Sequence, residues 1–211
     1  MQAFTTHPDT PAERPFSQAC ANNQAPILAV LEHAFADSRQ VLEIGSGTGQ
    51  HSVYLAPRLP HLVWQTSDLP EHHAGIRAWH AAQPAPNLRA PLALDLQSSD
   101  WPQTTDGAFD AVFTSNTCHI VAWPLVERMF ALVGAQLPAG GVFALYGPFN
   151  CGGEFISDSN RAFDAWLRQR DAASGIRDIE ALQALGAQHG LALVQDHAMP
   201  ANNRTLVFRK T

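Results

Sequence analysis

The chain has 211 residues, of which 45% are hydrophobic, and this length and composition are those of a globular domain with a sizeable core. The formal net charge is −6, and the sequence contains no basic run. We therefore expect no nucleic-acid partner, because affinity for phosphates requires clustered Lys and Arg. No apolar run reaches the length of a membrane span, so we also expect no membrane partner.

Residues 1–16 contain prolines and few apolar side chains, which predicts an irregular N-terminal arm ahead of a single domain over residues 17–211. Residues 20–35 have apolar side chains near helical spacing, and strand-like and helix-like segments alternate after them. The expected strands are 41–44, 62–66, 92–96, 109–115 and 142–146. The expected helices between them are 50–58, 71–83 and 124–136.

The last part of the chain has a different pattern. Residues 179–189 form an amphipathic helix pattern, and the segments 191–194 and 206–209 are strand-like, with the irregular stretch 196–203 between them. Strands joined by a short connection pair as antiparallel neighbours. The prediction is an α/β fold with a mostly parallel sheet, helices on both faces and a C-terminal antiparallel strand pair.

A glycine-rich turn follows the first expected strand. Gly45, Gly47 and Gly49 alternate directly after an apolar run that contains Glu43. Such a turn lets the backbone approach a nucleotide-like ligand at the carboxyl end of a strand. A dinucleotide fingerprint needs glycine at position 50, where this chain has Gln50. The spacing favours a nucleotide-type cofactor other than a dinucleotide, and a simple turn is the alternative.

Two acidic residues follow the next two expected strands. Asp68 lies about twenty residues beyond the glycines, where a carboxylate that binds ribose hydroxyls is expected. Its alternative role is a helix N-cap, since Pro70 follows. Asp95 is placed to accept a hydrogen bond from an adenine amino group, and a turn-forming Asp is its alternative.

The ends of the fourth and fifth strands offer groups for chemistry. Asn116 and His119 follow the fourth strand, and Tyr146 ends the fifth. The unperturbed pKa of histidine lies near neutral pH, so His119 is a candidate general base, with a structural histidine as the alternative. The ten histidines show no metal-ligand spacing, so we expect no metal site. Three scattered cysteines without a paired pattern favour a reducing, cytoplasmic location.

Glu43 with the G-x-G-x-G spacing resembles the first motif of class I methyltransferases that use S-adenosylmethionine (SAM). Most of the chain further resembles a family of small, methyltransferase-like proteins of largely unassigned function. The resemblance rests on stretches that include a Tyr-Gly-Pro-Phe and a Met-Pro-Ala-Asn-Asn motif: residues 23–28, 46–51, 64–68, 146–149 with 159–160, 163–164 and 175–178, and 199–203. Members of that family usually carry Arg where this chain has Asn22.

The resemblance implies SAM as cofactor and S-adenosylhomocysteine (SAH) as product. The residues expected at the cofactor are Glu43, Gly45, Ser46, Gly47, Gly49, Gln50, His51, Asp68, Leu69, Asp95, Leu96 and Asn116. The residues expected at the methyl acceptor are Asn23, Tyr146, Asn160, Asp164, Arg177 and Asn202, with His119 and Tyr146 as catalytic candidates. The alternative for the acceptor set is that these side chains link a lid to the sheet by hydrogen bonds.

The sequence thus predicts a SAM-dependent methyltransferase that acts on a small molecule. One alternative is a protein that binds SAM or SAH without catalysis, as a sensor or an interaction partner. The absence of the family Arg at position 22 favours that alternative. A nicotinamide-dependent oxidoreductase is disfavoured by Gln50 and by the final antiparallel pair.

Overall fold

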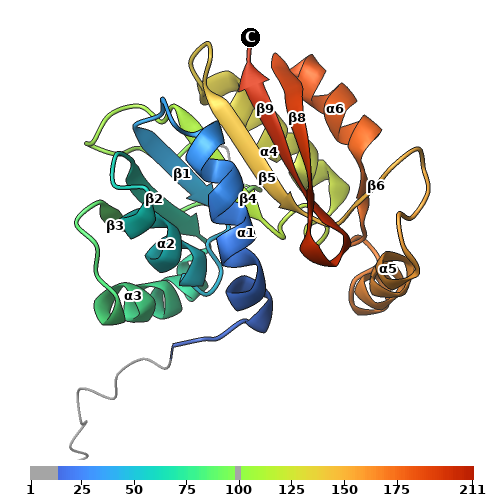
Figure 1. The fold of residues 1–211 in the computed structure, drawn as a ribbon, viewed down its shortest axis with the longest axis horizontal. Helices are drawn as coiled ribbons and strands as arrows, with labels where there is room; N and C mark the ends of the chain where they lie inside the picture. The colour runs from blue at the N-terminus through green and yellow to red at the C-terminus, as the bar shows by residue number, and fades with distance from the viewer. Residues whose placement is uncertain (1–13, 98–100) are drawn as a thin grey trace, which may run out of the picture.

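The computed structural model describes residues 14–97 and 101–211, and its centre is a seven-stranded sheet (Figure 1). The strand order is β3-β2-β1-β4-β5-β9-β8. The first five strands in chain order are parallel, and β9 is antiparallel to both of its neighbours, β5 and β8. The strands are β1 (Gln40–Ile44), β2 (Val63–Asp68), β3 (Leu88–Ala93), β4 (Ala111–Ser115), β5 (Val142–Gly147), β8 (Leu191–Met199) and β9 (Asn203–Lys210).

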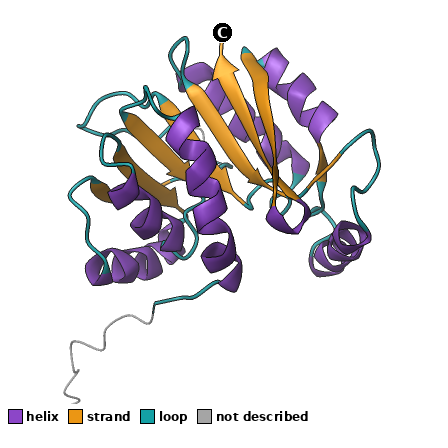
Figure 2. Cartoon of the chain, in the orientation of Figure 1, coloured by secondary structure: helices purple, strands orange, loops and turns teal. Residues whose placement is uncertain are grey.

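Helices cover both faces of this sheet (Figure 2). They are α1 (Gln18–Ala34), α2 (Gln50–Leu55), α3 (His73–Ala82), α4 (Trp123–Gln136), α5 (Asp158–Arg170) and α6 (Ile179–Gln188). Short 3-10 turns are η1 (Ala56–Arg58), η2 (Pro70–His72) and η3 (Pro200–Asn202), and a small parallel ladder pairs β6 (Phe149–Asn150) with β7 (Arg177–Asp178). Within the described ranges, no helix has the length and apolarity needed to cross a membrane.

Alternate residues along the strands build two cores. On one face, strand residues such as Phe143 and Leu145 pack with α4 and α6. On the other face, Ala144 and Tyr146 belong to the cluster that contains the apolar residues of α1 and α2. This alternation follows from the two-residue period of a strand. The predicted architecture of a parallel sheet with helices on both faces and an antiparallel C-terminal pair is confirmed.

The third strand is displaced from its expected position. The sequence pattern predicts a strand over 92–96, but β3 runs from Leu88 to Ala93 and the residues after it form a loop. β3 contains Pro91, which cannot donate a hydrogen bond to a ladder. β3 is an edge strand, where one side needs no partner, and it accommodates the proline.

The C-terminal hairpin is longer than predicted. The stretch 196–203 was expected to be irregular, but residues 196–199 belong to β8. β9 begins at residue 203, so residues 203–205 precede the predicted start of this strand at 206. β8 lies at the sheet edge with most of its residues exposed or half-buried, so its sequence lacks the apolar pattern of a covered strand. The helix predicted over 50–58 ends at Leu55 and continues as η1, because Pro57 has no amide hydrogen to extend the α-helical bonds.

Helices α1 and α5 and the short strands β6 and β7 lie near the carboxyl ends of the sheet strands. The sequence gives near-helical spacing at residues 159–160 and 163–164 but no bounds for α5, and β6 and β7 are too short to leave a signal. α1 begins after the N-cap Ser17, whose side chain accepts a hydrogen bond from the Cys20 amide. The predicted arm over residues 1–16 lies mostly outside the described residues.

Candidate functional site

The glycine loop between β1 and α2 is built from left-handed backbone. Gly45 has φ of +70°, Gly49 has φ of +87°, and Gly47 is also positive. A Cβ on Gly49 would lie 2.9 Å from the Cα of Ile76, so this glycine lets α2 pack closely against α3. A Cβ on Gly45 would lie 3.0 Å from Thr117 Oγ1, whereas one on Gly47 would meet only the Gly45 carbonyl at 4.0 Å.

Asp68 at the end of β2 anchors this loop. Its Oδ2 accepts a hydrogen bond of 2.6 Å from the Gly47 amide, and its Oδ1 accepts from the Leu69 amide at 2.7 Å. The ring Nδ1 of His72 lies 2.6 Å from the same Oδ1. The N-cap of the following turn is Leu69, so the alternative N-cap role of Asp68 is not observed. The carboxylate instead sets the position of the loop backbone.

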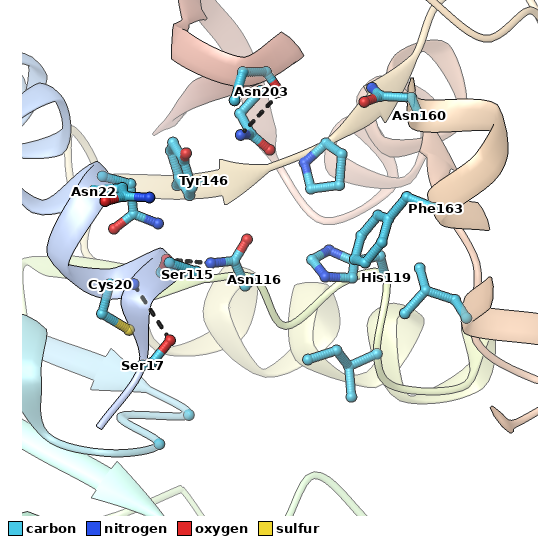
Figure 3. A pocket seen from close by; sticks show the side chains of 18 of the residues that line it. Ser17, Cys20, Asn22, Ser115, Asn116, His119, Tyr146, Asn160, Phe163 and Asn203 are labelled. Atoms are coloured by element: carbon cyan, nitrogen blue, oxygen red, sulfur yellow. Dashed lines mark hydrogen bonds between the residues drawn. The ribbon is translucent and has the colours of Figure 1, made fainter. Parts of the chain in front are cut away.

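A cavity of about 1010 Å³ opens beside the loop, between α1, the segment after β4, the end of β5, α5 and the 200–203 turn. Figure 3 shows Asn22, Tyr146 and Asn116 in one part of it and His119 and Phe163 in another. Ten of the predicted site residues line it: Asn23, Gly45, Ser46, Gly47, His51, Asn116, His119, Tyr146, Asn160 and Asn202.

Other predicted residues lie outside this lining: Glu43, Gly49, Gln50, Asp68, Leu69, Asp95, Leu96, Asp164 and Arg177. A second hollow of about 480 Å³ adjoins the loop on the side of α3, and its lining includes Gly47, Thr48 and His72, the partner of Asp68. Asp95 Oδ1 accepts a hydrogen bond of 2.8 Å from the Gln97 amide, the geometry of its alternative role in a turn.

Glu43 lies beneath the loop rather than in the cavity. Its Oε2 accepts a hydrogen bond of 2.9 Å from the indole Nε1 of Trp64, and the residue is 1% exposed. Burial raises the pKa of this carboxyl to about 7. The expected contact of Glu43 with a ligand is therefore not visible in its geometry, and the side chain supports the loop from the core.

Gln50, at the start of α2, connects the residue before α1 to the glycine loop. Its Oε1 accepts a hydrogen bond from the Ser17 amide, and its Nε2 donates to the Ser17 carbonyl. Nearby, the indole of Trp79 donates to the Pro15 carbonyl at 2.7 Å. Residues 15–17, just before α1, therefore lie against the glycine loop and α3. The hydrogen bonds of Gln50 to Ser17 keep them there.

Three buried polar side chains meet at one wall of the cavity. His51 Nε2 lies 2.7 Å from Asn23 Oδ1, and Tyr146 lines the same cavity. Burial lowers the pKa of His51 to about 4 and raises the pKa of Tyr146. Both rings are therefore neutral at pH 7.

Aromatic rings form the opposite wall. The His119 ring packs edge-on against Phe163 with 5.4 Å between centroids, and Phe163 stacks on Trp166 at 5.7 Å. Burial lowers the pKa of His119 to about 4, and the nearby Arg177 charge acts in the same direction. His119 is therefore an uncharged imidazole at the cavity, and its lowered pKa makes it a weaker proton acceptor than an ordinary histidine.

Asp164 and Arg177 link chain segments to one another. Asp164 accepts hydrogen bonds of 2.7 Å from the Ile176 amide and from Arg168 Nε. The Arg177 guanidinium donates to the carbonyls of Cys118, Val121 and Ala173. Their position agrees with the linking alternative given by the sequence, and the structure does not bring them to the cavity.

Asn160 and Asn202 combine a structural contact with a cavity-facing position. The Asn160 Nδ2 donates to the Asn202 carbonyl at 3.1 Å, which fastens α5 to the 200–203 turn. Ala201 and Asn202 have φ of +58° and +57°, a conformation that non-glycine residues seldom adopt outside turns. This strained turn forms part of the cavity rim.

The sequence pointed to residues 159–160 and 163–164 of α5 but not to the lining residues further along the helix. Phe163, Trp166, Leu167 and Arg170 all line the cavity from this helix. Their spacing of three, four and seven residues marks one helical face, so a periodicity search over 158–170 is the signal that could have found them. Among the residues that the structure describes, no group of three or more His, Cys, Asp or Glu could hold a metal ion.

The fold is shared with O-methyltransferases of known structure. An O-methyltransferase family protein from Burkholderia thailandensis matches with a TM-score of 0.75 at 16% identity, over 92% of this chain and 57% of that one. Human N-acetylserotonin methyltransferase in complex with SAM matches with a TM-score of 0.75 at 13% identity, over 92% of this chain and 53% of that one.

An O-methyltransferase family 2 protein from Planctomyces limnophilus, in complex with apigenin, matches with a TM-score of 0.76 at 20% identity, over 92% of this chain and 60% of that one. This chain therefore spans little more than half the length of these structures. At such identities the likeness defines a class I methyltransferase fold. The chain belongs to the family described as "Protein of unknown function (DUF938)", whose model matches residues 14–210.

Proposed function

We propose that this protein is a SAM-dependent methyltransferase that transfers a methyl group to a small-molecule acceptor. The observation that carries the proposal is the glycine loop, held by Asp68 at the carboxyl edge of a methyltransferase-type sheet and open to a cavity of about 1010 Å³. In open α/β sheets, ligands bind outside this edge of the strands.

The loop fits an extended nucleoside–amino-acid cofactor. The two hollows share Gly47 and Thr48, so one extended ligand that crosses the loop reaches both. Asp68 lies on the side of the smaller hollow and would receive the ribose hydroxyls, while Gly45 and Asn116 line the larger one and would meet the methionine end. When bound, the cofactor supplies an electrophilic methyl group on a sulfonium.

The residues of this chain would then orient the methyl acceptor and accept its proton. Methyl transfer of this kind is a direct displacement, so orientation and exclusion of water contribute more than covalent catalysis. Phe163 and Trp166 form an aromatic wall beside His119, whose neutral imidazole would accept the proton that an attacking hydroxyl or thiol loses, as a base weakened by its lowered pKa. Tyr146 lines the same cavity, together with Asn23 and His51.

One observation favours a second candidate function, the binding of SAM or SAH without catalysis. Asn22 lines the cavity where the resembling family usually has Arg, and its Oδ1 accepts a hydrogen bond of 2.8 Å from Gln18 Nε2. Arg170, in the last turn of α5, is the one lysine or arginine among the described lining residues. Fewer cations leave less attraction for a ligand carboxylate.

Calorimetric titration of the full chain with SAM, SAH and NADH tests the proposal. We expect micromolar binding of SAM and SAH and none of NADH. Asp68→Ala should abolish this binding, whereas Asp196→Ala, which removes a surface partner of Arg204, should leave it unchanged. Absence of binding to both SAM and SAH in the folded wild type would overturn the proposal.

Turnover separates the two candidate functions. Incubation with labelled SAM and a fractionated metabolite pool should release SAH only if an acceptor is methylated. Loss of turnover in His119→Gln with unchanged SAH affinity would support the enzyme. Saturable SAH binding with no turnover in any fraction would favour the sensor.

A further inference from the structure

The cavity has two halves with different linings. The half beside the glycine loop is lined mainly by polar groups from α1, from the loop and from the segment after β4. Figure 3 shows Asn22 and Ser115 in this half, and Phe163 on α5 across the cavity from them. The half beside α5 holds four large apolar side chains, which are Ile120, Phe163, Trp166 and Leu167. A polar cofactor end and an apolar second ligand would therefore occupy different halves.

Two of the apolar side chains in the α5 half are exposed. Ile120, in the turn after β4, is 55% exposed, and Trp166 on α5 is 47% exposed. Both line the same cavity. Large apolar side chains that are exposed together in a hollow mark a ligand site, because a ligand that covers them removes apolar surface from water.

A series of ring contacts leads along α5 to a cation. The His119 ring packs on Phe163, Phe163 stacks on Trp166, and the Cζ of Arg170 lies 4.7 Å from the centroid of the Trp166 ring. Phe163 and Arg170 are seven residues apart, so they share one face of the helix and are separated by about 10 Å along it. A ligand that follows this face from His119 reaches the guanidinium.

Arg170 has hydrogen-bond donors that no described residue uses. Its guanidinium lies over the Trp166 ring but makes no hydrogen bond or ion pair with any described residue. Asp171 also lines the cavity, but its Oδ1 accepts a hydrogen bond of 2.9 Å from the Ala173 amide, and it forms no ion pair with Arg170. A planar guanidinium whose donors are unused is suited to bind a carboxylate with two parallel hydrogen bonds.

We propose that the α5 wall, made of Ile120, Phe163, Trp166, Leu167 and Arg170, binds the methyl acceptor, and that this acceptor is an apolar carboxylic acid. Its apolar body covers the exposed side chains, and its carboxylate binds the guanidinium about 10 Å from the end at His119. The acid carries a single negative charge, because one cation beside one aspartate does not balance a phosphate dianion. That this ligand is the methyl acceptor rests on the proposed function, but the binding of an apolar acid by the wall does not.

Calorimetric titration of the full chain with 2-naphthoate, 2-naphthamide and acetate, each with and without SAH, tests the proposal. The amide keeps the apolar body without the charge, and acetate keeps the charge without the body. We expect 2-naphthoate to bind about fivefold more tightly than the amide, and acetate not to bind detectably. Equal affinities for 2-naphthoate and the amide, or no binding of 2-naphthoate to the folded protein, would overturn the proposal.

A pair of arginine variants isolates the charge. Arg170→Gln should remove the difference between 2-naphthoate and the amide. The matched control is Arg161→Gln, because Arg161 is also on α5 and also lies over an aromatic ring, Phe155 at 4.9 Å, but is outside the cavity lining. It should retain the fivefold difference, and circular dichroism checks that both variants are folded. A difference that survives in Arg170→Gln contradicts the assignment of the carboxylate.

A second pair of variants isolates the apolar surface. Trp166→Leu should weaken both naphthyl probes by about fivefold, and Trp166→Phe, which keeps an aromatic face, should restore most of the affinity. Val194→Ala is the control, because Val194 is 49% exposed on β8 and lies outside the cavity lining. Unchanged affinity for 2-naphthoate in Trp166→Leu would place the probe elsewhere and overturn the proposal.

Comparison with octanoate distinguishes two forms of the apolar body. Tighter binding of 2-naphthoate indicates a planar ring, and tighter binding of octanoate indicates a flexible chain; either result supports an apolar acid if Arg170→Gln removes the preference for the charged form. A probe that competes with SAH instead of binding beside it would overturn the assignment to the acceptor. If the wild type binds neither SAM nor SAH, the proposed function fails, while the titrations without SAH still test the wall.

Discussion

The two sides of the cavity are built in different ways. The glycine-loop side is one continuous segment, and its shape comes from backbone conformation fixed by a single carboxylate, Asp68. The opposite wall combines side chains of α5 and the 200–203 turn with His119 after β4. A site that must bind a constant ligand can rely on backbone, whereas a site for a specific acceptor needs side chains that vary.

This contrast has a consequence for mutation. A change in the glycine loop acts on backbone geometry and on packing against α3, so it alters the fold and the cofactor site together. A change on the α5 wall acts through one side chain or one hydrogen bond, so its effect on the cofactor site should be small. The following four predictions test this difference, beginning with the largest effect.

Gly49→Ala should destabilise the protein far more than Gly140→Ala. The two glycines have φ of +87° and +81°, but a Cβ at position 49 would lie 2.9 Å from the Ile76 Cα and one at position 140 meets nothing within 4 Å. We expect losses of about 2–4 kcal/mol at position 49 and about 1 kcal/mol at position 140 in urea denaturation. Equal losses would mean that the α2–α3 contact does not require the glycine.

Glu43→Gln should stabilise the protein at alkaline pH. The carboxyl has a folded-state pKa of about 7 against an ordinary 4.5, so its contribution is complete below pH 4.5 and is lost as the pH rises through 7. Gln stays neutral and still accepts from Trp64. Urea denaturation should show the variant more stable by about 2–3 kcal/mol at pH 8 and equal to the wild type at pH 4.5. A gap that does not depend on pH contradicts the burial of an ionisable group there.

Asp164→Ala should weaken the docking of α5 without changing the cofactor site. It leaves the buried Ile176 amide without its 2.7 Å acceptor, which should lower the free energy of unfolding by about 1–2 kcal/mol. SAH affinity, measured by calorimetry, should stay at the wild-type value. The control Asp196→Ala breaks a surface pair with Arg204 and should cost less than about 1 kcal/mol. A parallel loss of SAH affinity would show that the two sides of the cavity are coupled.

Asn22→Arg should increase SAH affinity slightly. Position 22 lines the cavity near the glycine loop, and a cation there can pair with the ligand carboxylate. Because the pair is partly solvated, we expect about a threefold gain. Asn22→Gln, which adds length without charge, should show no gain, and the same affinity in both variants would place the carboxylate elsewhere.

The order of the elements could be read from the chain because local patterns define them. The strands from 40 to 147 and the final hairpin follow from apolar runs. Only β3, the edge strand that contains Pro91, begins and ends clearly before the predicted residues. The C-terminal part of β8 and the bounds of α5 escaped prediction for one reason. Both are largely exposed, so burial leaves no strong hydrophobic pattern in their sequences.

The sequence by itself determined the glycine loop, the acid at the end of β2 and the alternation of strands and helices. These features depend on residues close together in the chain, where φ preference, capping and hydrophobic period act directly. Only the tertiary structure decided that Glu43 contacts Trp64, that Asp164 and Arg177 hold backbone, and that Asn23 contacts His51. Such contacts depend on the register of distant elements and on burial, and local sequence specifies neither.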